Sequence, residues 1–198
     1  MKWRKQRRKL NNKGLTLIEM VVAIAIIGIF STVVMTFITS GANFYRKVSI
    51  TTKLQSDMQT TLESIENAIM DTNVKIMYTS GGTSIDNDID STAAVQKKLT
   101  LERTDPTADE DSKRYLLTIF EWKPSEQKLY YNNGYEENDV INESATDIAV
   151  LAENVSGFQV DISKAKSEGI VLFRLTLKKG DKEISQLYTV TLRNKVEI

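Results

Sequence analysis

The residue with the clearest chemistry in this sequence is a single carboxylate, Glu19, inside an apolar run. From Leu15 to Ile38 the run has 24 residues, and Glu19 is its only charged side chain. As a helix rising about 1.5 Å per residue, it would extend about 36 Å, which exceeds the roughly 30 Å hydrocarbon core of a bilayer. An ionisable group in such a segment is costly and usually has a partner, so Glu19 is a candidate functional residue.

The residues before the apolar run are strongly basic. Residues 1–14 contain seven Lys or Arg side chains and no acidic one, although the whole chain has a formal net charge of zero. The rest of the chain therefore has 19 basic against 26 acidic residues. By the positive-inside rule we expect a cytoplasmic N-terminus and an extracytoplasmic segment after about residue 40. The acidic remainder argues against nonspecific nucleic-acid binding.

The sequence contains no cysteine and no histidine among its 198 residues. Disulfides, thiol catalysis, catalytic triads with histidine and most zinc sites are therefore excluded. An enzyme built on carboxylates, Lys, Ser or Tyr is still compatible with the composition. We nevertheless expect a protein that is not an enzyme, with no catalytic residue, no metal ligand and no cofactor.

Two acidic segments are the remaining candidates for a metal site. The segment from Asp86 to Asp90 is similar to the first half of an EF-hand loop, but Ser91 and Lys97 stand where that loop needs Gly and Glu. We therefore predict a solvated polar loop over residues 79–92, with an oxygen-only calcium site as the minority alternative. A second segment holds four acids that we place in a flexible hairpin loop: Asp105, Asp109, Glu110 and Asp111.

Aromatic residues give two further predictions. Tyr130, Tyr131 and Tyr135 are interleaved with Asn and Gly and could stack on a ligand, but such a cluster is more often a strand end followed by a turn. Phe120 and Trp122 are two residues apart, which predicts that both lie on the buried face of a sheet.

The elements that position these residues follow from apolar periodicity. A helical stripe with spacings of four, four, three and four continues beyond the apolar run, which predicts one helix of about 60 residues. Its members are Leu54, Met58, Leu62, Ile65 and Ile69. We expect this stripe to pack against a sheet rather than to bind a cofactor.

Strand patterning dominates the second half of the chain. The turn sequence Lys179-Gly180-Asp181-Lys182 predicts that the last two strands form a hairpin. The fold class is therefore α+β, with an antiparallel sheet head lying on the C-terminal half of the long helix. The predicted strands are Val74–Tyr78, Lys98–Arg103, Arg114–Trp122, Lys128–Asn132, Phe158–Ile162, Ile170–Lys178 and Glu183–Arg193.

Residues 13–24, Lys-Gly-Leu-Thr-Leu-Ile-Glu-Met-Val-Val-Ala-Ile, closely resemble the type IV prepilin leader of pilins and pseudopilins. The resemblance implies a pilin-like fold and cleavage by an aspartic prepilin peptidase between Gly14 and Leu15, followed by N-methylation of Leu15. Glu19 would then be the fifth residue of the mature chain. In the family's arrangement it pairs with the amino terminus of a neighbouring subunit, so that two costly charges neutralise each other.

The resemblance also implies a domain organisation. Residues 1–14 would be a cleaved basic leader, and residues 15–40 a transmembrane and filament-core helix. Residues 41–77 would continue this helix against the head, and residues 78–198 would form the antiparallel sheet head. We expect a single-pass protein of the cytoplasmic membrane whose head later belongs to an extracellular or periplasmic filament.

The function implied is that of a minor pilin or pseudopilin of a type IV pilus or type II secretion pseudopilus. The segments Glu153–Phe158 and Tyr188–Asn194 resemble W-type minor pilins and J-type type II secretion pseudopilins. Expected partners are prepilin peptidase, other pilins or pseudopilins, the inner membrane assembly platform and membrane lipid. The alternatives are a competence pseudopilus subunit, for which nucleic acid would be a partner, and a signal-anchored extracytoplasmic enzyme or receptor.

Overall fold

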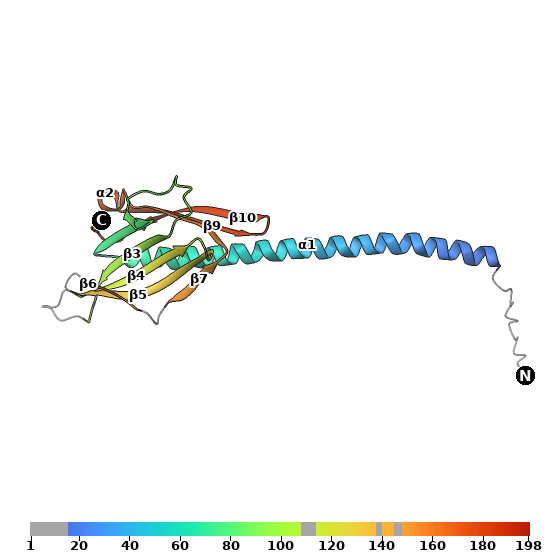
Figure 1. Cartoon of the computed structure of the whole chain (residues 1–198), viewed down its shortest axis with the longest axis horizontal. Coiled ribbons are helices and arrows are strands. Elements are labelled where there is room, and N and C mark those ends of the chain that lie inside the picture. Colours follow the sequence, from blue (N-terminus) through green and yellow to red (C-terminus); the bar gives the residue numbers. More distant parts are fainter. Residues whose placement is uncertain (1–15, 108–113, 138–139, 145–147) are drawn as a thin grey trace, which may run out of the picture. The chain divides into compact units, whose positions relative to one another are not determined.

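The computed structural model of the chain describes residues 16–107, 114–137, 140–144 and 148–198. The chain forms two compact units, Met1–Val48 and Ser49–Ile198. Helix α1 (Leu17–Asp71) begins in the first unit and ends in the second, where the sheets lie (Figure 1). The fold is α+β and pilin-like, as the sequence predicts. We call the second unit the head.

The part of α1 that belongs to the head buries one apolar stripe. All five predicted members are at most 5% exposed, and Ile65 and Ile69 are fully buried. Thr61 also lies on the buried side, where its hydroxyl donates a hydrogen bond to the backbone oxygen of Asp57 at 2.6 Å. The predicted stripe is therefore confirmed as a core-facing surface.

Helix α1 ends earlier than the expected boundary at residue 77. After Asp71, the hydroxyl of Thr72 donates to the backbone oxygen of Ala68 at 2.9 Å. The side-chain oxygen of Asn73 accepts a hydrogen bond from the backbone N–H of Thr104 at 2.8 Å. These side-chain bonds to backbone compete with further helix, and residues 75–77 are already part of a strand.

The larger of two sheets has seven antiparallel strands. Its order is β2-β1-β3-β4-β5-β6, and β7 also pairs with β5. The strands are β1 (Lys75–Ser80), β2 (Thr83–Ser84), β3 (Lys97–Thr104), β4 (Arg114–Lys123), β5 (Lys128–Glu137), β6 (Val140–Glu143) and β7 (Ala149–Glu153).

The smaller sheet has three antiparallel strands in the order β10-β9-β8. They are β8 (Val155–Asp161), β9 (Ile170–Lys179) and β10 (Lys182–Thr191), and the short helix α2 (Ala165–Glu168) lies between β8 and β9 in sequence. The predicted hairpin is confirmed, because Lys179 pairs with Lys182 across a two-residue turn. Gly180, the first turn residue, has a φ of +59°, which favours glycine.

The sequence predicts one sheet, whereas the head contains two. The chain passes from the larger to the smaller sheet at Asn154, which separates β7 from β8 and has a φ of +60°. Asn tolerates this left-handed conformation better than most residues. The backbone oxygen of Asn154 then accepts a hydrogen bond from Lys178 in β9 at 2.8 Å. One residue thus redirects the chain and fixes it to the second sheet.

Strand β5 is longer than predicted and continues through the expected turn to Glu137. Gly134 makes this extension compatible with β6, because a Cβ atom at that position would lie 2.7 Å from the backbone oxygen of Asn142. The glycine therefore marks a close approach between strands and not a chain reversal. The sequence analysis also missed β2, β6, β7 and α2.

The core lies between α1 and both sheets. Phe120 and Trp122 are 0% and 3% exposed, so their predicted position on a buried face is confirmed. The indole N–H of Trp122 donates to the backbone oxygen of Val155 at 3.1 Å, which links the two sheets. Phe158 and Phe173 bring the smaller sheet into the same buried cluster.

Candidate functional site

Helix α1 begins with a reciprocal capping arrangement between Thr16 and Glu19. One carboxylate oxygen of Glu19 accepts hydrogen bonds from the backbone N–H of Thr16 at 2.8 Å and from its hydroxyl at 2.9 Å. The backbone N–H of Glu19 donates to the hydroxyl of Thr16 at 3.4 Å. This is the capping box, in which the first residue and the fourth satisfy each other's unpaired donors.

The structure thus places Glu19 in the first turn, folded back toward the start of the chain. Gly14 and Leu15, the expected cleavage and methylation residues, lie outside the described residues. Thr16 is a capping residue that could not be identified from the apolar run alone. The spacing of Thr16 and Glu19, with two apolar residues between them, was the available signal.

The part of α1 in the first unit leaves its apolar side chains uncovered. The most exposed are Leu17 at 83% and Phe37 at 81%, and the large apolar residues from Leu17 to Ile38 are all at least 40% exposed. Soluble proteins rarely expose a continuous apolar surface of this extent. It therefore requires lipid or other protein around it.

The polar side chains within this apolar segment are satisfied by the helix itself. The hydroxyls of Ser31 and Thr32 donate to backbone oxygens of the preceding turn, each at 2.7 Å. Thr36 and Thr39 make equivalent bonds at 2.9 Å and 2.7 Å. Because unpaired polar groups are costly in an apolar medium, this local pairing suits the segment to a membrane or a helix bundle.

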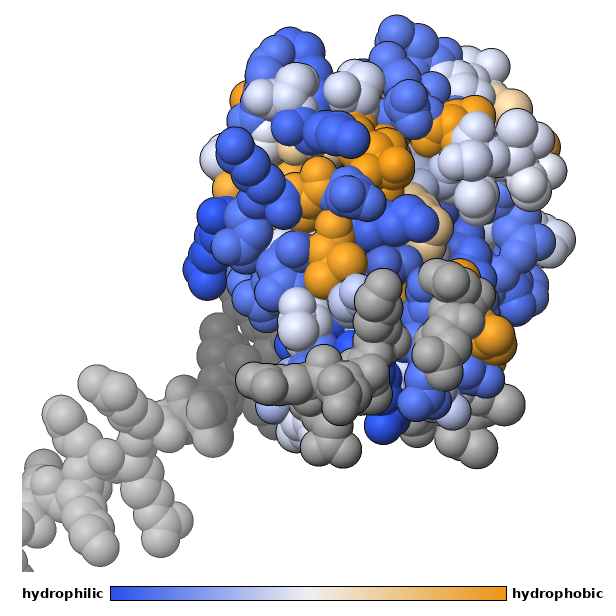
Figure 2. All heavy atoms as spheres, turned by 90° about the vertical axis from the view of Figure 1, so that its left-hand side faces the viewer, coloured by the Kyte–Doolittle hydropathy of each residue, from blue (hydrophilic) through white to orange (hydrophobic). Residues whose placement is uncertain are grey.

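Helix α1 is the one helix in the described part of the chain that is long and apolar enough to cross a membrane. Its most apolar 18-residue window has a mean hydropathy of 2.7, and none of that window is buried. The head differs in its surface, since Figure 2 shows one face on which small apolar patches are separated by polar side chains.

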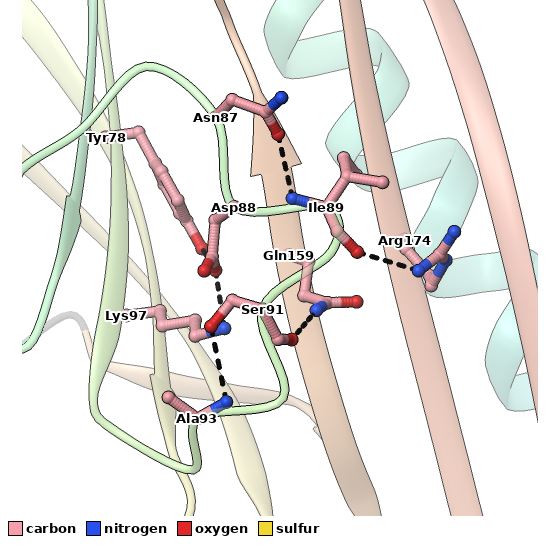
Figure 3. A network of polar contacts seen from close by, with 9 residues as sticks. All are labelled: Tyr78, Asn87, Asp88, Ile89, Ser91, Ala93, Lys97, Gln159 and Arg174. Atoms are coloured by element: carbon pink, nitrogen blue, oxygen red, sulfur yellow. Dashed lines mark hydrogen bonds and ion pairs between the residues drawn. The ribbon is translucent and has the colours of Figure 1, made fainter.

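The first acidic segment of the head is solvated, as the sequence predicts, at Asp86, Asn87 and Asp90, but not at Asp88. Asp88 is 4% exposed, and its carboxylate lies 2.5 Å from the ammonium of Lys97 (Figure 3). The same carboxylate accepts a hydrogen bond from the hydroxyl of Tyr78 at 2.8 Å. Burial and the bond to Asp88 raise the pKa of Tyr78. A lysine ammonium is therefore the cation beside Asp88.

Residues 85–96, which we call the strap, connect the two sheets through this ion pair and through hydrogen bonds. On the larger sheet, Lys97 of β3 holds Asp88. On the smaller sheet, Arg174 donates to the backbone oxygen of Ile89 at 2.7 Å, and Gln159 donates to the backbone oxygen of Ser91 (Figure 3). The strap is consequently a fixed part of the head.

The second acidic segment is described only at its beginning. Asp105 is 6% exposed and accepts hydrogen bonds from the backbone N–H and hydroxyl of Thr107, at 2.9 Å and 2.7 Å. These bonds, together with Arg114 nearby, lower the pKa of Asp105. Strands β3 and β4 on either side are antiparallel, as predicted. Residues 109–111 lie outside the described residues.

The three tyrosines do not form one stacking surface. Tyr130 and Tyr131 are adjacent in β5 and therefore point to opposite faces of the sheet. Tyr131 lies 5.7 Å from the ring of Phe120, and the guanidinium of Arg114 lies 4.6 Å from the ring of Tyr135. The prediction of a strand end and turn is wrong for these residues, since β5 includes all three.

Two carboxyl groups meet on the larger sheet. Glu102 of β3 is 2% exposed, and the carboxyl of Glu136 in β5 is near enough to act on its charge. Burial and the neighbouring carboxyl raise the pKa of Glu102 to about 7, while Lys75 opposes this shift. Among the described residues, no three acidic side chains form a group suited to hold a metal ion.

A known sequence motif matches the residues before the apolar run and most of the run itself. Residues 9–35 match the family model of the prokaryotic N-terminal methylation motif. The chain carries the type IV prepilin and pseudopilin signature. Neither a curated protein nor a solved structure gives a significant match to this chain.

This prepilin signature supports a pilin or pseudopilin in general, and pilins are structural subunits rather than enzymes. It implies processing by prepilin peptidase and assembly with other pilins. The apolar part of α1 fits a single-pass membrane anchor with a C-terminal head. The match includes Thr16 and Glu19, so the capping box lies inside the family's motif.

Proposed function

We propose that this chain is a minor pilin or pseudopilin, which enters a type IV pilus or a type II secretion pseudopilus through its N-terminal helix. The observation that carries the proposal is the uncovered apolar surface of residues 17–38 with one carboxylate at its start. Apolar side chains exposed to this extent require lipid or neighbouring subunits around them.

The proposed processing explains the order of the first residues. Prepilin peptidase cleaves between Gly14 and Leu15 and methylates Leu15, which removes the seven basic residues after they have oriented the chain. The N-terminus is then at the cytoplasmic side and the head is extracytoplasmic. Residues 15–40 span the membrane and later form the filament core, with the inner membrane assembly platform as a further partner.

The capping geometry supports a role for Glu19 in assembly. In the described chain its carboxylate accepts hydrogen bonds from neutral groups of Thr16. Cleavage creates an α-ammonium at Leu15 with an ordinary pKa of about 7.7 to 8.0. A charge-assisted bond to an ammonium is stronger than a bond to a neutral donor. Glu19 therefore exchanges Thr16 for the amino terminus of a neighbouring subunit.

The rival hypothesis of a signal-anchored enzyme would need a converging acid pair that substrate can reach. Glu102 and Glu136 do converge, but Glu102 is 2% exposed. A cleft of about 370 Å³ lies between α1 and the larger sheet, and Asp71 is its one acidic lining residue. The acid pair and the cleft thus do not combine into a catalytic site.

Coexpression with a prepilin peptidase tests the proposal. The mature mass should correspond to loss of residues 1–14 and addition of one methyl group. Glu19→Gln should be processed and inserted in the membrane as the wild type is, yet be absent from sheared filaments. Glu168→Gln, at an exposed position of α2, is the matched control and should enter filaments normally. An unprocessed wild-type chain, or normal incorporation of Glu19→Gln, would contradict the proposal.

A further inference from the structure

Strand β10 forms an open edge of the smaller sheet. Among the described residues it pairs with β9 alone, in an uninterrupted register from Lys182 to Thr191. The opposite edge of this sheet, β8, is different because the strap covers part of it. There the backbone N–H of Asp88 donates to the backbone oxygen of Val160 at 2.9 Å, and the backbone N–H of Ile162 donates to the backbone oxygen of Asp86 at 2.6 Å.

The hairpin geometry identifies which groups of β10 point outward. The two-residue turn makes Lys179 and Lys182 the closing hydrogen-bonded pair, and such pairs alternate along antiparallel strands. Ser185, Leu187 and Thr189 are then in non-hydrogen-bonded positions, with their N–H and C=O groups directed to the open edge. The short contact of 2.9 Å between the hydroxyls of Ser185 and Thr176 agrees, since side chains are closer in such pairs.

This edge lacks the features that usually prevent strand addition. Natural edge strands carry charged residues, proline or a bulge. The only charges of β10 are at its beginning, Lys182 and Glu183, and the segment from Ile184 to Thr191 has neither charge nor proline. The register with β9 contains no bulge, and Leu187 at its centre is 47% exposed. An edge left this open is suited to pair with another strand.

A groove of about 560 Å³ runs between β10 and α1 beside this edge. Side chains of a strand added about 4.8 Å from β10 would lie near this groove. The helix contributes apolar and amide side chains to its walls, and β10 contributes Ile184, Gln186 and Tyr188. The lining residues from α1 are Gln55, Met58, Gln59, Leu62 and Glu63.

The groove is acidic at one end. There Glu63 lines the groove, and Glu66 accepts a hydrogen bond from the hydroxyl of Tyr188 at 2.9 Å. The hairpin turn beyond the other end carries charges of both signs, Lys179, Asp181, Lys182 and Glu183, and these are not among the residues that line the groove. An occupant antiparallel to β10 would start at the acidic end. It would therefore carry a basic residue near its start.

We propose that β10 accepts an extended segment of a neighbouring pilin-type subunit by strand addition, with an uncharged centre and a basic residue near its start. The proposal rests on the proposed function, because it is filament assembly that brings such a neighbour to the head. Main-chain hydrogen bonds would supply affinity, and the walls of the groove would select the side chains. The head would thus join its neighbour through a sheet as well as through α1.

Cysteine labelling of the full chain tests whether the edge is covered. The sequence contains no cysteine, so Gln186→Cys introduces a single thiol in the groove and Lys166→Cys a single thiol on the exposed helix α2. A maleimide should label Gln186→Cys at least about tenfold less in sheared filaments than in the membrane-resident pool. Labelling of Lys166→Cys should be the same in the two pools. Equal labelling of Gln186→Cys in both pools would overturn the proposal.

A proline variant tests whether the contact is made by main chain. Thr189→Pro removes an N–H that points outward, which edge strands tolerate, and Thr189→Ala is the matched control. Thr189→Pro should lower incorporation into filaments at least about tenfold without changing processing, and Thr189→Ala should not. Equal incorporation of both variants would overturn strand addition.

Two further outcomes separate this proposal from others. A disulfide-linked pair of Gln186→Cys chains in filaments would show that the occupant is a second copy of β10, which overturns the assignment to another segment. If wild-type chain is processed but never enters filaments, the proposed function fails and strand addition falls with it. Normal incorporation of Thr189→Pro together with loss of Glu19→Gln would instead contradict strand addition alone.

Discussion

Glu19 at the start of α1 and Asp88 in the strap are both carboxylates that accept hydrogen bonds, yet they differ in the kind of partner they have. Glu19 accepts hydrogen bonds from neutral groups of Thr16, three residues away. Asp88 faces the ammonium of Lys97 and the hydroxyl of Tyr78, both buried in the head. The first carboxylate can exchange its partners without disturbing any core, whereas the second is fixed by tertiary structure.

The same contrast holds for the apolar residues of α1. In the first unit these residues are exposed, whereas in the head one apolar stripe of α1 is buried against the sheets. The two parts of this helix are therefore in different environments, and they should tolerate different substitutions. Four predictions test this comparison, in order of decreasing effect.

The largest effect is expected for Lys97→Ala. Removing the ammonium leaves Asp88 as a buried, uncompensated charge, which costs about 3–5 kcal/mol. Urea unfolding followed by the fluorescence of Trp122, whose ring lies 5.7 Å from the ammonium, measures this loss. Lys98→Ala removes a partly exposed ion pair with Glu143 and should cost less than about 1 kcal/mol. Similar losses for both variants would show that the strap is not fixed by its ion pair.

A matched pair of substitutions on α1 compares its two halves. Ile65→Ala creates a cavity in the core and should lower the free energy of unfolding of the head by about 2–5 kcal/mol. Ile27→Ala changes a residue that is 63% exposed in the first unit and should alter it by less than about 0.5 kcal/mol. Equal effects in the same unfolding measurement would mean that the two halves of α1 are not energetically separate.

A smaller, pH-dependent effect is expected at Glu102. Its folded pKa of about 7 lies above the ordinary value of 4.5, so the folded head binds a proton more tightly than the unfolded chain. The stability of the head should therefore fall as pH rises from about 4.5 to about 7 and then level off. Glu102→Gln should flatten this fall in urea titrations across that range, and Glu168→Gln should leave it unchanged. An unaltered profile in Glu102→Gln would exclude Glu102 as its cause.

The smallest effect is expected at Thr16 in the uncleaved chain. Thr16→Ala removes the capping hydroxyl, whereas Thr16→Ser retains it. Amide hydrogen exchange in detergent micelles should be roughly fivefold faster in the first turn of Thr16→Ala, with Thr16→Ser close to wild type. Identical exchange in both variants would mean that Glu19 holds the turn without the hydroxyl.

Much of the fold follows from the sequence because its signals are local. The apolar run, the helical stripe and the hairpin turn at Gly180 each depend on residues close together in the chain, and all are confirmed. Strand β7 was missed because Ala149–Glu153 consists of Ala, Val, Leu and Glu, most of which favour helix. Its pairing with β5 overrides that local preference.

The features that could not be predicted depend on residues distant in sequence. The burial of Asp88 requires β1 and β3 to bring Tyr78 and Lys97 around it, which no local pattern encodes. The division into two sheets depends on the conformation of Asn154. For the N-terminal site, the sequence alone indicated Glu19, whereas the capping role of Thr16 emerged from the structure.

The hydroxyl bonds inside the apolar part of α1 have a consequence for its extraction from a membrane. Ser31, Thr32, Thr36 and Thr39 all donate to oxygens of their own helix. Moving the segment from lipid into a bundle of helices breaks none of these bonds. The hydrogen bonding of these hydroxyls is therefore the same in both environments. Glu19 is the exception, and the exchange of partner that we propose for it would give the transfer a direction that apolar contacts alone would not provide.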